Sequence, residues 1–163
     1  MATSTDRPFL YSEAERRRRD ASPWTLVQGI LAPLQFAIFL VSLVLVSRTL
    51  ATGEGAALAN ASVIAKTLAL YAIMVTGSLW EKAVFGRYLF APAFFWEDAV
   101  SMLVLALHTA YLVALATGAL GTAGLMLLAL GAYATYLVNA GQFLLKLRAA
   151  RLQAPAYAMG VAR

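Results

Sequence analysis

Two adjacent acids, Glu97 and Asp98, stand at the start of an uncharged segment that contains the only histidine of the chain, His108. Three aromatic residues, "FFW", directly precede the acids, and a third acid, Glu81, ends the apolar segment before them. Aromatic walls that desolvate carboxyl groups form pockets in which acids and bases are tuned. One interpretation of the pattern is therefore acid–base chemistry, with Glu97, Asp98 and Glu81 as the candidate catalytic residues.

A structural interpretation of the same stretch competes with the catalytic one. Acids near the N-terminus of a helix complement the helix dipole and mark the membrane interface. Trp24, Trp80 and Trp96 likewise fit an interfacial aromatic belt. The sequence leaves both interpretations of the two acids open.

The two basic side chains inside the apolar segments, His108 and Lys66, also admit two roles each. His108 either hydrogen-bonds a neighbouring helix, through Asn139 or Gln35, or serves a bound pigment as axial ligand or proton carrier. Lys66 costs about 2.5 to 3.5 kcal/mol at mid-span on insertion scales. It either snorkels or pairs with another helix, or it anchors a ligand.

The composition places the chain in the membrane. It has 163 residues, of which 61% are hydrophobic, and a mean hydropathy of +0.73. The 13 Lys and Arg residues stand mostly in short segments that flank long uncharged ones, which is typical of membrane topology and not of nucleic-acid binding. The absence of cysteine excludes disulfides, thiolate metal sites and a cysteine nucleophile, and with one histidine no dedicated metal site is expected.

Charge-free stretches predict four transmembrane helices, because a helix needs about 20 apolar residues to cross roughly 30 Å of hydrocarbon. Residues 21–47 and 99–145 carry no charge, and residues 55–80 carry only one. The glycines of "TGALGTAG" at 117–124 predict a turn that divides the last stretch in two. The predicted helices cover residues 24–51, 56–80, 97–117 and 123–146.

The predicted fold is therefore all-α, an integral membrane bundle of four transmembrane helices in one domain over residues 24–151. Residues 1–23 form a basic N-terminal segment and residues 152–163 a tail, and both ends are expected to pack poorly. A signal peptide is not expected, because the first apolar run is too long for one. Positive charges fall on one side of the four spans, with only Arg48 on the other, so the positive-inside rule places both termini in the cytoplasm.

Polar side chains inside the spans indicate the inner faces of the helices, because a polar group in hydrocarbon is costly unless it faces protein. Glu97 and His108 share one face but lie about 16 Å apart along the axis, too far for a direct hydrogen bond. This spacing suits a bulky ligand held between them. A second polar stripe runs along the last helix and consists of Thr135, Asn139, Gln142 and Lys146.

Three segments of the chain resemble one known family: "SPWTLVQGILAPLQFAIFLVSLVLV", "GSLWEKAVFGRYLFAPAFFWEDAVSMLVLALHTAYL" and "YATYLVNAGQFLLKLRAARL". They are similar to the 3-vinyl (bacterio)chlorophyllide hydratases of bacteriochlorophyll biosynthesis. The resemblance covers residues 24–152, and its most specific parts are "WEK" and "FAPAFFWED".

The resemblance implies that water is added across the 3-vinyl group of chlorophyllide a or bacteriochlorophyllide a, which gives a 1-hydroxyethyl group. No cofactor is expected for such a hydration. The resemblance also implies a multi-pass protein in the lipid bilayer of the cell inner membrane or of an intracytoplasmic photosynthetic membrane. Other enzymes of the pathway are candidate partners, and nucleic acid is not.

A hydration of this kind needs one group that gives a proton and another that takes one. Glu97 and Asp98 are the first candidates for these two roles. Because adjacent residues on a helix point about 100° apart, they need not both enter one pocket, and Glu81 competes for the second role.

We expect the macrocycle among the helices, with its magnesium on His108 as the axial ligand and its propionate at Lys82 or Arg87. The protein itself is expected to hold no metal. The other expected substrate contacts are Lys66, Trp80, Phe94, Phe95, Trp96, Tyr111, Tyr133, Tyr136 and Asn139.

Two other classes of protein fit parts of the pattern. A non-catalytic membrane subunit would bind a pigment or quinone and organise a larger complex, although one histidine excludes a bis-histidine haem site within a single chain. A small transporter would use Lys66 as its coupling charge. A product heavier than chlorophyllide by one water distinguishes a hydratase from both.

Overall fold

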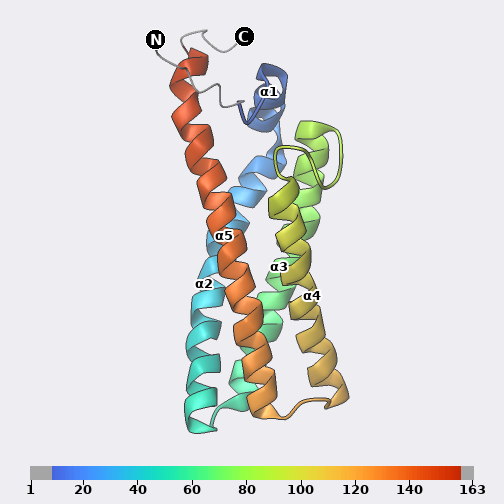
Figure 1. The fold of residues 1–163 in the computed structure, drawn as a ribbon, viewed down its shortest axis with the longest axis vertical. Helices are drawn as coiled ribbons and strands as arrows, with labels where there is room; N and C mark the ends of the chain where they lie inside the picture. Colours follow the sequence, from blue (N-terminus) through green and yellow to red (C-terminus); the bar gives the residue numbers. More distant parts are fainter. Residues whose placement is uncertain (1–8, 159–163) are drawn as a thin grey trace, which may run out of the picture.

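The computed structural model describes residues 9–158, with side chains through Gln153, and this part of the chain forms five helices without a strand (Figure 1). Four of them, α2 to α5, are long and apolar enough to cross a membrane. The prediction of an all-α bundle with four transmembrane helices is confirmed. The helices are α1 Glu13–Ala21, α2 Pro23–Thr52, α3 Ala56–Phe85, α4 Phe95–Thr117 and α5 Thr122–Ala158.

Glycines end the helices where the sequence predicts turns. Gly53, which ends α2, has a φ of 76°, and Gly118, which ends α4, has a φ of 65°. Only glycine adopts this left-handed conformation without a steric cost, so each is a natural stop after an apolar run. The resulting short connections make α2 and α3, and α4 and α5, antiparallel neighbours (Figure 1).

Two helices extend past their predicted ends. The predictions stopped at residues 80 and 146, but α3 continues to Phe85 and α5 to Ala158. A charge-free stretch marks only the part of a helix that crosses the hydrocarbon, because the helix can continue through charged residues beyond the membrane. Glu81 and Lys146 therefore lie inside helices near one end of the bundle.

The prediction that the N-terminal segment packs poorly is wrong for its described part. Residues 13–21 form α1, which begins with a capping box in which the Ser12 side chain accepts from the Glu15 backbone and the Glu15 side chain accepts from the Ser12 backbone. Tyr11, just before this helix, is buried among aromatic side chains.

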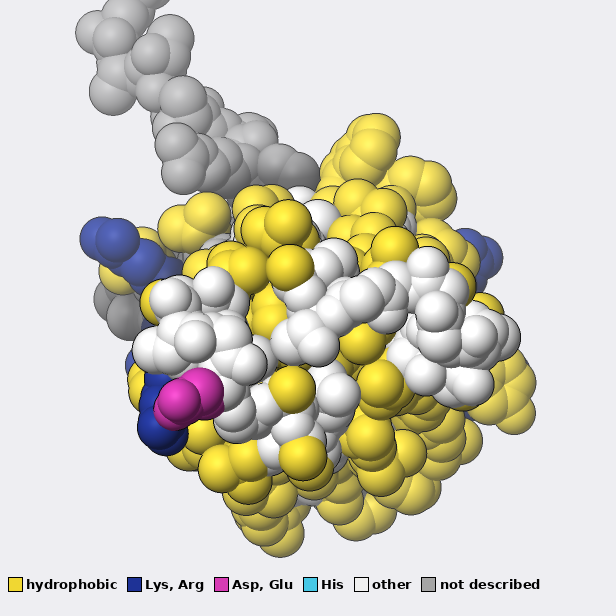
Figure 2. Space-filling view, turned by 90° about the horizontal axis from the view of Figure 1, so that it is seen from below, with side chains coloured by type: hydrophobic (Ala, Val, Ile, Leu, Met, Phe, Trp, Pro, Cys, Tyr) yellow, Lys and Arg dark blue, Asp and Glu magenta, His cyan; other side chains and the backbone are white. Residues whose placement is uncertain are grey.

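The two ends of the bundle differ in charge. We call the end that carries α1, the loop of residues 86–94 and the C-terminal part of α5 the basic end (Figure 1). The opposite face shows mostly hydrophobic and uncharged side chains, with charged atoms only near its edge (Figure 2). Two of the counted charges, Arg7 and Arg163, lie outside the described residues. The cytoplasmic location of the basic end stays a prediction from the charge count.

The interior of the bundle combines apolar packing with interhelical hydrogen bonds. Phe39, Val63, Val104 and Met126 are fully buried core residues from four helices. Large apolar side chains also cover the outside of the spans, as a lipid-facing surface requires. Packing and polar contacts hold these helices together, because lipid offers no hydrophobic gain for helix association.

Candidate functional site

The carboxyl groups of Glu81 and Asp98 form a buried pair between α3 and α4, near the basic end. Both side chains are buried, and successive N–H groups of one loop donate to them, so the two carboxyl groups are held near each other. Two buried carboxylates repel each other, which favours a state in which one of them carries a proton. The arrangement is therefore suited to holding one proton on the pair.

The loop of residues 86–94 supplies the backbone donors of this pair. The Phe90 N–H donates to Asp98 Oδ2 at 2.7 Å, and the Ala91 N–H donates to Glu81 Oε2 at 3.1 Å. Phe90 has a φ of 58°, a conformation that is unfavourable for a residue with a side chain. Such strain persists only where the surroundings impose it, and here it turns two successive N–H groups toward the two carboxyl groups.

Glu97 points away from this pair and toward α5, as the angle between adjacent residues on a helix allows. Its Oε1 lies 3.6 Å from the Lys146 Nζ, which also donates to the Ala93 backbone oxygen. Its Oε2 is buried and has no hydrogen-bond partner within the protein. Glu97 thus combines a lysine counter-ion with one buried carboxylate oxygen that has no hydrogen-bond partner in the protein.

Asn139 fixes the first turn of α4 against α5. Its Nδ2 donates to the Glu97 backbone oxygen at 2.8 Å, and its Oδ1 accepts from the Ser101 hydroxyl at 3.1 Å. The amide group of Asn139 thus holds the helix turn that carries Glu97 and Asp98. Its contact with substrate stays a prediction.

Aromatic side chains form a cluster beside the carboxyl groups. The Phe94 ring is the centre of this aromatic cluster, with centroids 5.5 Å from Trp80, 5.8 Å from Phe85 and 6.0 Å from Phe143. Phe94 directly precedes α4, so it lies one helical turn, about 6 Å, from Asp98. Tyr11 completes the cluster from the N-terminal segment.

The other predicted substrate contacts at the basic end of the bundle have exposed side chains. Phe95 and Trp96 are exposed, so they do not belong to the aromatic cluster. The Lys82 Nζ donates to the Gly86 backbone oxygen at 2.9 Å and lies 5.2 Å from the Tyr88 ring centroid. Arg87 is an exposed residue of the same loop. Both cations are therefore on the rim of the site.

Lys66 and His108 form a separate polar layer in the middle of the bundle. The Lys66 Nζ lies 3.5 Å from the Tyr136 ring centroid, and the His108 ring lies 5.8 Å from the Tyr133 ring. The His108 Nδ1 is 2.8 Å from the Val104 backbone oxygen, which leaves Nε2 without a partner in the protein. Lys66 and His108 are both 0% exposed.

Tyr111 also makes a hydrogen bond within the protein. Its hydroxyl donates to Asn60 Oδ1 at 2.7 Å, and its ring is fully buried. It therefore links α4 to α3.

The polar layer and the carboxyl groups lie at different depths in the bundle. Asp98 and His108 are ten residues apart, about 15 Å along α4. The axial-ligand role of His108 stays a prediction, and the mechanism proposed for the carboxyl groups does not use it.

The Lys66→Met variant tests whether the middle layer is structural. We expect it to raise the free energy of unfolding, because a lysine at mid-span costs about 2.5 to 3.5 kcal/mol, and to leave kcat/KM within about 2-fold of the parent since the carboxyl groups are distant. The measurement is reversible unfolding in mixed micelles together with turnover. Lys82→Met, at the exposed rim, is the control that should not alter stability. A large loss of turnover in Lys66→Met would instead support its predicted contact with substrate.

Among residues 9–158, no group of three or more His, Asp and Glu side chains is arranged to hold a metal ion.

Three parts of the site were missed by the sequence analysis: Lys146, Tyr11 and the backbone of the loop. Lys146 had a signal, because it ends the polar stripe that contains Asn139. Tyr11 had none, since it lies in a polar segment without helical apolar periodicity. The loop donors depend on the backbone conformation of Phe90, which a sequence pattern does not reveal.

Comparison with known proteins gives one consistent result. A family model described as 2-vinyl bacteriochlorophyllide hydratase (BCHF) matches residues 11–149. The 2-vinyl bacteriochlorophyllide hydratase of Rhodobacter capsulatus is 66% identical over 148 residues, which are 91% of this chain and 86% of the relative. The protein of the same name from Cereibacter sphaeroides is 66% identical over 148 residues, which are 88% of this chain and 89% of the relative. No solved structure matches the chain.

Proposed function

The chain belongs to the 2-vinyl bacteriochlorophyllide hydratase family, and from this premise we propose that it adds water to the vinyl group of chlorophyllide a or bacteriochlorophyllide a to give a 1-hydroxyethyl group. The vinyl position numbered 2 in the relatives' names corresponds to the one numbered 3 above. The observation that supports this reaction best is the presence of three buried carboxyl groups with different partners at one end of the bundle.

The Glu81–Asp98 pair is the proposed acid. Two buried carboxyl groups held near each other are proposed to share one proton, and the N–H groups of Phe90 and Ala91 remain to stabilise the negative charge after that proton leaves. The proton goes to the terminal vinyl carbon, whose π electrons form the new C–H bond. The carbon next to the ring becomes a cation that is delocalised over the macrocycle.

Glu97 is the proposed base. Its Oε2 has no partner in the protein, so it can accept a hydrogen bond from a water molecule. That water attacks the cationic carbon, and Glu97 takes the proton that the water loses. The net change is one water added, and proton exchange with solvent restores the acid and the base.

The carboxyl groups of Glu81, Asp98 and Glu97 are also proposed to stabilise the positive charge that develops on the carbon next to the ring. Fixed charges next to a developing opposite charge stabilise a transition state strongly in a site that excludes water. Lys146 balances the charge of Glu97, and its Nζ lies near Oε1, the oxygen that is not the proposed base. We therefore propose that the unpaired oxygen, Oε2, is the one that meets the substrate.

The macrocycle is proposed to lie at the basic end, against the rings of Phe94 and Trp80, with its propionate near Lys82 or Arg87. Its apolar body and charged edge suit a site at a membrane interface, where aromatic rings and cations meet. We further propose a location in the inner or intracytoplasmic photosynthetic membrane. Neighbouring enzymes of the pathway are proposed partners that supply the pigment and take up the product.

The proposal is tested by incubating membranes that contain the protein with chlorophyllide a in water enriched in ¹⁸O. The expected product carries one additional water and the heavy oxygen on its side chain. The Glu81→Gln/Asp98→Asn double variant is the control without the proton-holding pair. Pigment that is bound but unchanged by the parent would favour the non-catalytic subunit and contradict the hydratase reaction.

A further inference from the structure

The N-terminal segment lies across the aromatic cluster at the basic end. We call residues 10–22, which include α1, the strap. Its Tyr11 ring stacks on Phe85 with a centroid distance of 5.8 Å and an interplanar angle of 11°, and it lies 6.3 Å from the Phe94 ring. Tyr11 is buried, and burial raises the pKa of its hydroxyl to about 12, so the side chain is neutral at physiological pH. A flat, neutral ring thus fills the place beside the cluster.

The rings beneath Tyr11 belong to the transmembrane helices. Phe85 and Trp80 are carried by α3, Phe94 directly precedes α4, and Phe143 is carried by α5. Tyr11 packs on two of these rings, Phe85 and Phe94, and a place that stacks one flat ring can stack another flat aromatic molecule. The strap provides only the outer side of this space.

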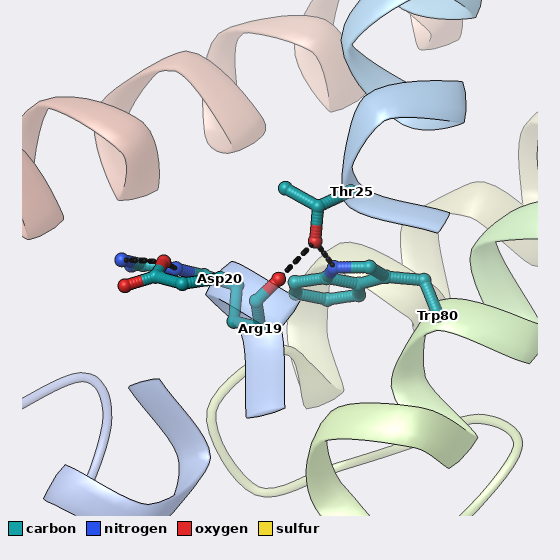
Figure 3. A network of polar contacts seen from close by, with 4 residues as sticks. All are labelled: Arg19, Asp20, Thr25 and Trp80. Carbon is teal, nitrogen blue, oxygen red and sulfur yellow. Dashed lines mark hydrogen bonds and ion pairs between the residues drawn. The ribbon is translucent and has the colours of Figure 1, made fainter. Parts of the chain in front are cut away.

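Polar contacts near both ends fasten the strap, in addition to the packing of α1 against α3 and the contacts of Tyr11 and Arg16. At one end the Leu10 N–H donates to Gln153 Oε1 at 3.0 Å. At the other the Thr25 hydroxyl donates to the Arg19 backbone oxygen at 2.6 Å and accepts from the Trp80 Nε1 at 3.0 Å (Figure 3). Arg19 lies over the Tyr11 ring at 4.8 Å and also contacts Asp20. Contacts at two ends with a ring between them suit a segment that lifts without disturbing the transmembrane helices.

We propose that the space under the strap is the binding site of the pigment macrocycle, and that Tyr11 occupies it until the macrocycle replaces it against Phe85 and Phe94. This inference rests on the proposed hydratase function. Phe94 connects the site to the chemistry, because it lies one helical turn from Asp98 and its ring centroid is 5.6 Å from the Lys146 Nζ, which is 3.6 Å from Glu97.

The charge of the strap fits the same ligand. Arg19 lies over the Tyr11 ring, 4.8 Å from its centroid, and so stands beside the proposed site, and the pigment carries a propionate carboxylate. Guanidinium groups pair with carboxylates in a two-point geometry. Arg19 is therefore a third candidate, after Lys82 and Arg87, for the cation that meets the propionate.

The decisive experiment locks the strap in place. The chain has no cysteine, so Leu10→Cys combined with Gln153→Cys gives one defined thiol pair, at positions joined by a backbone-to-side-chain hydrogen bond. Mass spectrometry confirms the disulfide that oxidation forms between them. The probe is chlorophyllide with its vinyl group reduced to ethyl, which binds but cannot be hydrated. Binding is read from quenching of Trp80 fluorescence in a background with Trp24→Phe and Trp96→Phe, since the chain has three tryptophans.

We expect the oxidised variant to bind the probe at least about 10-fold more weakly than its reduced form, because locking removes the open state. The single-cysteine variants are the controls and should not respond to oxidation. Equal affinity in the oxidised and reduced forms overturns the proposal.

A second variant keeps the test independent of disulfide formation. Tyr11→Ala removes the competing ring, so we expect binding about 3- to 10-fold tighter, whereas Tyr11→Trp should bind more weakly. A purely structural role of Tyr11 predicts weaker binding or no change in Tyr11→Ala, and that result contradicts the proposal.

The two proposals fail in different ways. If the parent protein gives no hydrated product but the locked strap still abolishes probe binding, the binding site stands and the hydratase reaction does not. If hydration proceeds equally with the strap locked and unlocked, the reaction stands and the site under the strap is wrong.

Discussion

The Asp98→Asn variant is expected to lower kcat about 100- to 10,000-fold, the usual contribution of general acid–base catalysis. An amide cannot share a titratable proton with Glu81, so the proposed proton donor is lost. It retains the shape of the carboxyl group and can still accept from the Phe90 N–H. The helices should therefore remain folded, which circular dichroism and thermal unfolding check. Turnover of chlorophyllide measures the effect.

The control for Asp98→Asn is Asp20→Asn, which removes an acid from an exposed ion pair of the strap. That change should leave kcat nearly unaltered. Near-parental turnover in Asp98→Asn, with the fold intact, would remove the Glu81–Asp98 pair from the mechanism.

The Glu97→Gln variant is expected to lower hydration about 100-fold or more, because the attacking water loses its base. Its second expected property identifies the role. In D₂O the Glu81–Asp98 pair can still protonate the vinyl group, and the cation can return to alkene by losing either isotope. Deuterium should therefore enter the terminal vinyl carbon of unreacted substrate in Glu97→Gln, whereas Asp98→Asn should show neither hydration nor exchange. Mass spectrometry of recovered substrate measures both.

Glu54→Gln, in the turn between α2 and α3, is the matched control for Glu97→Gln and should hydrate normally. The opposite isotope pattern, with exchange in Asp98→Asn and none in Glu97→Gln, would reverse the assignment of acid and base. Loss of hydration and exchange in both variants would mean that Glu97 also takes part in the first proton transfer.

The number and order of the transmembrane helices follow from the sequence because the bilayer acts on local composition. A helix in lipid must satisfy its own backbone hydrogen bonds and present an apolar surface, so length and charge alone locate each crossing. The predicted ends of α2 and α4 agree with the structure to within a few residues. The predicted C-terminal ends of α3 and α5 came too early, because a charged residue does not end a helix where water and headgroups replace hydrocarbon.

The functional residues were predicted by type but not by grouping. Glu81, Glu97 and Asp98 were all recognised as candidates, and the 100° angle between adjacent residues showed that the last two could face different neighbours. Which carboxyl groups meet depends on the packing of α3 against α4. Likewise Phe94 and Trp80 were expected near the substrate together with Phe95 and Trp96, yet only the first two lie inward.

The sequence by itself determined that this is a four-span membrane protein with acids at one interface, since hydropathy and charge are properties of each segment. The tertiary structure alone decided the pairing of Glu81 with Asp98, the separate contact of Glu97 with Lys146, and the position of Tyr11 over the aromatic cluster. Each of these contacts joins residues from different helices or from the loop and the strap. Their geometry depends on helix rotation and on the backbone of Phe90, and neither is encoded in a local pattern.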